Sequence, residues 1–242
     1  GIVDGEDGAS AFVLPRAEVE VHDTWETSGM RGTGSHHVKL TGAFVPGHRR
    51  IERARWTARD NPGAALHPEP LYGYDLRDVP VFLIPAIVLG AAEALLELQR
   101  ERLDTRREVL TRKLTGDTAA AQLRYARALS ELRAARALLD RAVTLTIETN
   151  AAGPDSMSDE LRALIKLDCL SVVRAAWESA QTGLVSAGAS VYRSGDITQH
   201  FVRDMQMILN HLTIDQDVMA GKAAEILLGR TNGEAEPAQH FV

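Results

Sequence analysis

The feature that most constrains the fold is the succession of helical patterns between residues 79 and 229. Apolar residues recur there at spacings of three, four and seven, which is typical of amphipathic helices. The patterns predict long helices over 81–111, from about Asp117 to Gly153-Pro154, and over 159–187, followed by shorter helices over 197–209 and 214–228. Long antiparallel helices joined by short breaks form a bundle, which is the arrangement that we expect here.

Particular residues predict the helix ends and the buried faces. Asp117 is a favourable N-cap, Ser156 to Asp159 fit a capping box, and Gly229 is a favourable C-cap. The opening turns of the first helix are apolar all round, so we expect burial on every side. On the second and third helices the expected buried residues are Leu123, Ala126, Leu129, Leu132, Leu139 and Val143, and then Leu161, Leu164, Ile165, Leu170, Val173 and Trp177.

Residues 1–51 have the pattern of short β-strands. We expect strands over 11–14, over 17–25 and from Ser35 onward, where Val38 and Leu40 alternate with polar residues. Strands this short need a covering layer to be stable. The predicted class is therefore α+β, a short β-layer followed by a long C-terminal four-helix bundle. We expect a partial β-domain at 1–51, a connector at 52–78, a helical bundle domain at 79–229 and a flexible tail at 230–242.

Composition narrows the classes of protein that this chain can represent. Its 242 residues have a net charge of −6 with acidic and basic residues interspersed, so we expect no nucleic-acid partner. The longest uncharged run, 79–92, contains Pro80 and Pro85 and suits a bundle helix better than a membrane span. A single cysteine, Cys169, favours a reducing compartment, and we expect a cytoplasmic protein. The first residue is Gly1 rather than Met, so we expect part of a longer protein.

A glycine-punctuated turn, Met30-Arg31-Gly32-Thr33-Gly34-Ser35, precedes the strand that begins at Ser35. Glycine permits positive φ and a close approach of the backbone to a ligand, and the two hydroxyls can donate or accept hydrogen bonds. The spacing does not match a dinucleotide fingerprint or a P-loop. Two interpretations therefore stay open from the residues alone, a tight hairpin and a cradle for a cofactor.

Other residues could carry chemistry, and each also has a purely structural interpretation. His36 and His37 are adjacent on a strand and face opposite sides, so we expect no metal site there. His211 would share a helix face with Asp204 two turns earlier if that helix continued, and histidine changes charge near neutral pH. His211 could instead be a cap or a packing residue. Arg106 and Arg107 could bind a phosphate or could simply be solvated.

These segments, in this order, resemble the acyl-CoA dehydrogenase superfamily. The stretch from Trp25 through the glycine turn to Phe44-Val45-Pro46 resembles its central β-segment, and Arg203-Asp204 with His211 resembles a closing motif. The resemblance is strongest to the flavin-dependent monooxygenase branch, the oxygenase component of two-component aromatic hydroxylases. It covers nearly all 242 residues, but the N-terminal helical domain of that family is not part of this chain.

The resemblance implies a function and a set of site residues. Such enzymes take reduced FMN, or FAD, from a separate flavin reductase, form a flavin C4a-hydroperoxide with O2, and oxygenate a phenolic or related small molecule. His211 matches the catalytic histidine, which deprotonates the substrate or supports the peroxyflavin. The implied cofactor-binding residues are Trp25, Arg31, Thr33, Gly34 and Ser35 in the turn, with Arg106 or Arg107 at a phosphate across a subunit interface, typically in a homotetramer.

Three alternatives stay open beside this interpretation. An acyl-CoA dehydrogenase would need a glutamate base, commonly in Tyr-Glu-Gly near the C-terminus, and the sequence contains no Tyr-Glu-Gly. N-oxygenases that act on amino sugars share the scaffold. Because the N-terminal part supplies a wall of the substrate pocket in this family, a chain without it could also be a non-catalytic scaffold or oligomerisation module. In the favoured interpretation the active site lies between the β-layer and the bundle.

Overall fold

The computed structural model describes residues 10–52, 55, 62–153 and 156–230. The chain forms two compact units, Gly1–Val79 and Pro80–Val242, and each is described here by itself. The predicted four-part division of the chain stays a prediction. Residues 1–9, which open the expected β-domain, and 231–242, which make up nearly all of the expected tail, lie outside the described residues.

The described part of the first unit contains short strands in two separate sheets. Strand β1 (Ser10–Phe12) pairs antiparallel with β4 (Arg50–Glu52), and β2 (Glu20–His22) pairs antiparallel with β3 (His37–Lys39). A short helix, α2 (Pro62–Leu66), follows. The sequence pattern missed β4, because Arg50-Ile51-Glu52 contains only one apolar residue. Of the expected strand over 17–25, only Glu20–His22 is a strand, and residues 17 and 18 belong to a 3-10 turn at Arg16–Glu18.

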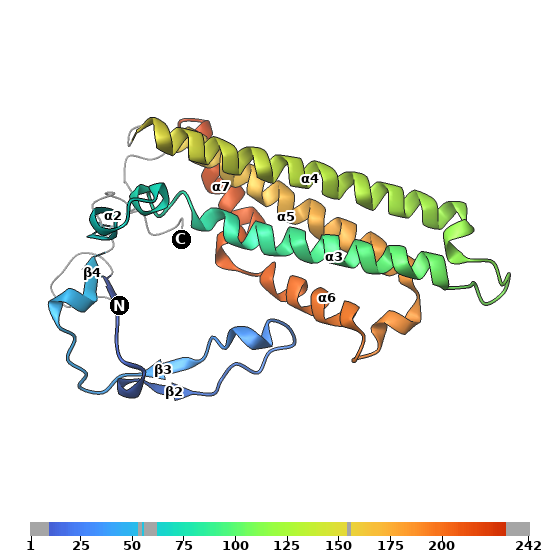
Figure 1. Cartoon of the computed structure of the whole chain (residues 1–242), viewed down its shortest axis with the longest axis horizontal. Coiled ribbons are helices and arrows are strands. Elements are labelled where there is room, and N and C mark those ends of the chain that lie inside the picture. Colours follow the sequence, from blue (N-terminus) through green and yellow to red (C-terminus); the bar gives the residue numbers. More distant parts are fainter. Residues whose placement is uncertain (1–9, 53–54, 56–61, 154–155, 231–242) are drawn as a thin grey trace. The chain divides into compact units, whose positions relative to one another are not determined.

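The second unit is a bundle whose long helices lie side by side (Figure 1). Helix α4 (Ala119–Ala152) runs antiparallel to α3 (Leu83–Thr105) and to α5 (Asp159–Ala187), and α5 packs on both of the others. The shorter helix α6 (Ile197–Ile208) packs on α3, and α7 (Gln216–Leu227) packs on α5. The predicted class, strands followed by a C-terminal helical bundle, is confirmed.

Side-chain caps begin four of these helices. Thr118 caps α4, Ser158 caps α5, Asp196 caps α6 and Asp215 caps α7, each by accepting a backbone N–H of the first turn. The prediction of α5 over 159–187 is confirmed at both ends. The N-cap of α4 is Thr118 rather than Asp117, which ends a preceding 3-10 turn.

Helix α3 ends earlier than the sequence pattern predicts. Arg106 is extended, and the residues after it form a hairpin turn in which Arg107 pairs with Leu114. Two backbone hydrogen bonds close this turn, from Glu108 N to Lys113 O (2.9 Å) and from Thr115 N to Arg106 O (2.8 Å). The predicted helical continuation to residue 111 is therefore wrong, because the turn satisfies these backbone groups without a helix.

The buried face of α4 differs from the predicted one. One buried line of α4 consists of alanines seven residues apart, namely Ala121, Ala128, Ala135 and Ala142. Beside it lies a second buried line of larger residues, Leu132, Leu139 and Thr146. Leu123 is 72% exposed and Leu129 38% exposed, and Ala126 is exposed as well, so these three were wrongly assigned to the core. The prediction missed the four alanines of the inner face, where small residues let α4 approach α5 closely.

Two further burial predictions fail within this unit. Leu83 and Ile87, in the first turns of α3, are 60% and 55% exposed, while Val88 and Leu89 are fully buried, so α3 is covered on one side only. On α5, Leu164 is 49% exposed, whereas Ile165, Leu170 and Val173 are buried as predicted. A periodic pattern identifies a helix but does not determine which of its apolar residues the neighbouring helices cover.

The segment Pro80–Thr105 is long and apolar enough to cross a membrane by length and composition. A helix that packs in the core of a bundle meets the same criterion, and one side of α3 packs on α4, α5 and α6. The expectation that this chain has no membrane partner stays a prediction.

An ion pair joins α3 to the start of α6. Arg102 donates two hydrogen bonds to the Asp196 carboxylate (2.8 and 2.9 Å) and one to Thr198 Oγ1 (2.8 Å). Burial acts to raise the pKa of Asp196, but hydrogen bonds from Thr198 and Arg102 outweigh it, so the pKa lies below its usual value of 3.8.

We expect the Asp196 carboxylate to stabilise the bundle above about pH 4 and to lose that contribution as the pH falls through its depressed pKa. Asp196→Asn keeps the helix cap but removes the charge. Thermal unfolding followed by circular dichroism between pH 2 and pH 7 should show a lower Tm for the variant at pH 7. The two proteins should converge at acid pH. A constant difference across this range would contradict the assignment.

The two leucines Leu132 and Leu123 of α4 test the buried face directly. Leu132→Ala should lower the free energy of unfolding by about 2–5 kcal/mol, because it leaves a cavity in the core. Leu123→Ala should change it by less than about 0.5 kcal/mol, because that side chain is exposed. Urea unfolding measures both. An equal loss at the two positions would contradict this core assignment.

Candidate functional site

The predicted cofactor turn lies in the long connection between β2 and β3. It is organised around one carbonyl, Met30 O, which accepts hydrogen bonds from Trp25 Nε1 (2.9 Å), Thr33 Oγ1 (2.8 Å) and Thr33 N (3.1 Å). Met30 and Gly34 both have left-handed backbone conformations, with φ of 51° and 57°. The glycine is needed at position 34, where an L side chain would be strained. The indole N–H of Trp25 and the hydroxyl of Thr33 are thus already hydrogen-bonded within the turn.

Two residues of this turn that the sequence predicts to bind a cofactor have polar groups that the turn itself does not use. Arg31 and Ser35 are exposed, and neither side chain has a hydrogen-bond partner within the described residues. Together they present a guanidinium and a hydroxyl from the two ends of the segment Arg31 to Ser35. The turn can therefore offer a ligand the donors of Arg31 and Ser35, whereas Trp25 and Thr33 mainly maintain its shape.

The base of the loop is closed by His36 and Thr24. His36 Nδ1 accepts from Thr24 N (3.2 Å), and Thr24 Oγ1 accepts from His37 N (3.0 Å). His36 thus has a structural role in the hairpin. Over the ranges that the structure describes, no group of three or more His, Cys, Asp or Glu residues could hold a metal ion.

Arg106, which the sequence predicts as a phosphate contact, lies where α3 ends beside the C-terminus of α5. Its guanidinium donates to Ala187 O, and a side chain at Gly188 (φ 74°) would overlap that guanidinium. The negative end of the α5 dipole favours a cation at this place. A hollow of about 280 Å³ adjoins it, lined among others by Glu108, Arg124 and Ser186.

Arg107 behaves differently from its neighbour. It is exposed, and its guanidinium donates to Arg112 O (3.0 Å) in the hairpin turn. Of the two arginines, only Arg106 lines the hollow at the end of α5. The structure therefore favours Arg106 over Arg107 as a residue for a bound anion.

His211 lies in the connection between α6 and α7, not on a helix. Helix α6 ends at Ile208, and His211 is extended and caps the 3-10 turn Leu212–Ile214. Because this helix does not continue to residue 211, His211 shares no helix face with Asp204, and it is a capping residue, which was one of the alternatives that the sequence left open. His211 is exposed, and its Nδ1 lies 2.9 Å from Thr213 Oγ1 and 3.2 Å from Thr213 N. No described residue is a hydrogen-bond partner of its Nε2.

Sequence reasoning missed a residue that supports this turn. Lys166 of α5 is only 3% exposed, and its Nζ donates to Thr213 O (2.9 Å). The sequence signal that could have identified it is a charged residue between two residues that the structure buries, Ile165 and Cys169. Burial lowers the pKa of Lys166 below its usual value.

Arg106 and His211 lie far apart within one chain. Arg106 contacts Ala187 at the end of α5, whereas the His211 turn contacts Lys166 near its beginning. At a rise of 1.5 Å per residue, these two positions of α5 are about 32 Å apart. One chain therefore does not bring Arg106 and His211 into a single site.

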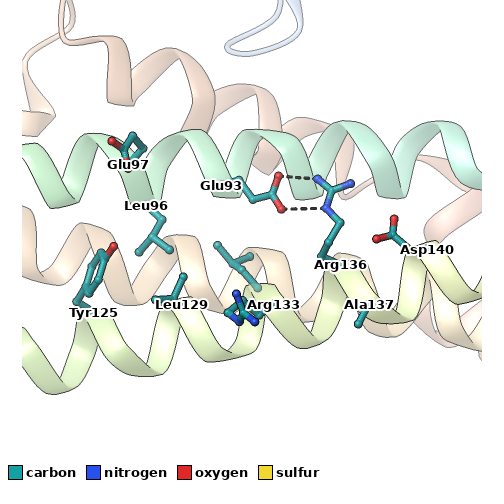
Figure 2. Close-up of a pocket in the computed structure, with 10 residues that line it drawn as sticks. Glu93, Leu96, Glu97, Tyr125, Leu129, Arg133, Arg136, Ala137 and Asp140 are labelled. Carbon is teal, nitrogen blue, oxygen red and sulfur yellow. Dashed lines mark hydrogen bonds and ion pairs between the residues drawn. The ribbon is translucent and has the colours of Figure 1, made fainter.

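A third feature is a groove of about 410 Å³ between α3 and α4, shown in Figure 2. Glu93 and Arg136 point toward one another across it and form a two-bond ion pair (3.1 and 2.5 Å). The hydrogen bond that Arg136 donates to Glu93 raises the pKa of Arg136. None of the predicted site residues lines this groove. The Glu93–Arg136 ion pair links the two helices across the groove, whereas Glu97 pairs with Arg100 of its own helix.

Comparison with known proteins identifies the family that this chain matches. The family described as "Acyl-CoA dehydrogenase, C-terminal domain" matches residues 82–216. A pigment production hydroxylase of Rhodococcus sp. is 29% identical over 85% of this chain and 52% of its own length. The oxygenase component of p-hydroxyphenylacetate 3-hydroxylase from Acinetobacter baumannii is 26% identical over 93% of this chain and 54% of its own length.

A solved structure is similar over the same range. XiaF from Streptomyces sp., in complex with FADH2 and glycerol, has a TM-score of 0.80 and 26% identity over 92% of this chain and 56% of that protein. The chain thus spans about half the length of the curated relatives that it matches. Because the family match covers more than half of its residues, this chain belongs to the acyl-CoA dehydrogenase C-terminal domain family, and its relatives include flavin-dependent monooxygenase oxygenase components.

Proposed function

We propose that this chain functions in the oxygenase component of a reduced-flavin-dependent monooxygenase that uses O2 to hydroxylate a phenolic or related small molecule. The observation that supports it most directly is the imidazole of His211, which a capping turn holds while its Nε2 keeps no partner among the described residues. A histidine with one free nitrogen can exchange a proton with a substrate hydroxyl at neutral pH.

The proposed cofactor is reduced FMN, with FAD as the alternative, and it supplies the electrons that activate O2. The residues present fit such a group. Arg31 and Ser35 offer uncommitted donors, and a flavin ring carries acceptor atoms along one edge. The hydrogen bonds to Met30 O hold the backbone of the loop that carries these two side chains. Thr33 and Trp25 support the turn, and Arg106 is the proposed contact for a phosphate.

The proposed partners follow from the same assignment. They are a separate flavin reductase, O2 and a small-molecule substrate, and we propose neither a nucleic-acid nor a membrane partner. We also propose a cytoplasmic homotetramer that assembles through the bundle. Several large apolar side chains of the bundle support self-association, because they are exposed in the single chain, namely Leu83, Ile87, Leu123, Leu164 and Val185.

His211→Ala should abolish substrate hydroxylation while leaving the helical fold intact, because the side chain is exposed. Loss of a general base lowers turnover by roughly 10²–10⁴-fold. The measurement is product formation from p-hydroxyphenylacetate, a trial phenol, with a flavin reductase, FMN and O2. His200→Ala, an exposed histidine of α6, is the matched control. Normal turnover by His211→Ala would refute the assigned role.

The same preparation separates the alternatives. A dehydrogenase would bleach oxidised flavin on addition of an acyl-CoA without a requirement for O2. A scaffold or oligomerisation module would bind no reduced flavin in an anaerobic titration. Either result would overturn the monooxygenase proposal.

Arg31→Gln should weaken the binding of reduced FMN by about tenfold or more, because it removes a charged hydrogen-bond donor. Ser35→Ala should weaken it less, since the lost donor is neutral. Anaerobic titration followed by absorbance measures both affinities. Arg49→Gln, at an exposed arginine of the same unit, is the control. An equal loss for Arg31→Gln and Arg49→Gln would show only a general charge effect and would contradict the assignment.

A further inference from the structure

The outer face of α4 carries a regular line of exposed residues. From Ala126 to Ile147, exposed residues recur at alternating steps of four and three, which is the spacing of a seam between packed helices. We call this line the outer seam, and it lies on the side of α4 opposite its buried alanines. Ala137 lies near the centre of the seam, and Arg133 and Asp140 flank that centre two turns apart.

The composition of the outer seam favours contact with another helix. Ala126 and Ala137 are small and exposed, and Ile147 is apolar and exposed. Small residues on a helix face let a second helix approach closely. The sequence pattern predicted burial for Ala126 and for the nearby Leu129, yet both are exposed in the single chain. A second helix on this face would supply the burial that the pattern predicts.

The two charged residues of the seam are not paired within the chain. Arg133 and Asp140 are exposed, and neither forms a hydrogen bond or an ion pair with a residue that the structure describes. Both line the groove of about 410 Å³ between α3 and α4 (Figure 2). The neighbouring Arg136, by contrast, is paired with Glu93. The groove thus offers space beside two opposite charges that the fold leaves unpaired.

The arrangement of these residues makes the seam complementary to itself. A two-fold axis midway between Arg133 and Asp140 brings an antiparallel copy of α4 alongside, with Arg133 level with Asp140 of the partner subunit. The same axis sets Ala126 level with Ile147 of the partner subunit. A symmetric dimer requires this self-complementarity, because the same patch meets itself. A segment of different sequence would not require it, so a second copy of this chain is the occupant that the residues favour.

We propose that α4 packs antiparallel on α4 of a second copy through the outer seam, with two symmetric ion pairs between Arg133 and Asp140 across the interface. Complementary charges fix the register and orientation of such a contact. The inference rests on the self-association in the proposed function, since it names the surface and the register of one interface. It does not depend on the proposed oxygenase chemistry.

Charge reversal tests the two ion pairs. Arg133→Glu sets like charges opposite one another at both symmetric positions, so association should weaken by roughly tenfold or more. Adding Asp140→Arg exchanges the two charges and should restore the affinity to within about threefold of the original value. Analytical ultracentrifugation over a range of protein concentrations measures the dissociation constant. Arg174→Glu, which makes the same charge change at an exposed arginine of α5, should leave it unchanged.

The outcomes separate this interface from the proposed function. If the chain self-associates and Arg133→Glu associates normally, the proposed oligomer holds and the outer seam fails as its interface. If the unsubstituted chain stays monomeric, the interface and the proposed oligomer both fail. Equal weakening by Arg174→Glu, or no recovery in the doubly substituted chain, would also overturn the ion pairs. None of these results alters the turnover assay of His211→Ala, which tests the oxygenase role separately.

Disulfide formation tests the antiparallel register. Ala137→Cys lies beside the axis, so mild oxidation should link two chains, as non-reducing electrophoresis shows. The native Cys169 is fully buried and does not compete. Ala126→Cys is the matched control, because an antiparallel pair separates its two copies by about 21 residues, or about 32 Å, beyond the reach of a disulfide. Linkage through Ala126→Cys, or none through Ala137→Cys, would overturn the arrangement.

Discussion

The packing of α5 against its neighbours is the interaction on which the bundle depends. Helix α5 contacts α3, α4 and α7, and its buried residues lie on several of its faces along most of its length. Small residues make this possible, because alanines on α4 and on α5 let the two helices approach closely. Burial raises the pKa of the Cys169 thiol on α5 to about 12, which leaves it an unreactive part of the core.

A rigid α5 fixes the separation of the chemical groups at its two ends. Arg106 is held at its C-terminus by the Ala187 carbonyl, where the helix dipole favours a cation. The turn of His211 is held near its beginning by the buried Lys166. Because the helix cannot shorten, these groups serve different places in any assembly. A phosphate contact by Arg106 and proton transfer by His211 are thus compatible only as contributions to separate sites or to different subunits.

The glycine turn shows how a loop can combine rigidity with free donors. Three hydrogen bonds converge on Met30 O, so the turn keeps its shape without help from a ligand. The donors that remain, on Arg31 and Ser35, belong to side chains that the loop does not need for its own stability. A preformed loop of this kind loses little conformational entropy on binding, which is what a cofactor site requires.

The sequence by itself determined the class of fold, most helix ends and the residues with chemical potential. Helical periodicity and capping residues are local, so α5 could be predicted from Asp159 to Ala187 without a structure. The turn at Gly34 and the histidine at 211 could likewise be recognised, because residue types carry their chemistry with them. What the pattern could not give was orientation, as Leu123 shows by lying on the exposed face of a correctly predicted helix.

Only the tertiary structure decided which polar side chains are hydrogen-bonded within the protein and which can bind a ligand. In the folded chain, Trp25 and Thr33 donate hydrogen bonds within their own turn, and Arg106 donates to a carbonyl at the end of α5. Lys166 donates to a carbonyl 47 residues later in the chain. Such contacts depend on how helices and turns pack. The physical reason is that burial and hydrogen-bond partners come from distant segments, whereas secondary structure and intrinsic chemistry arise from neighbouring residues.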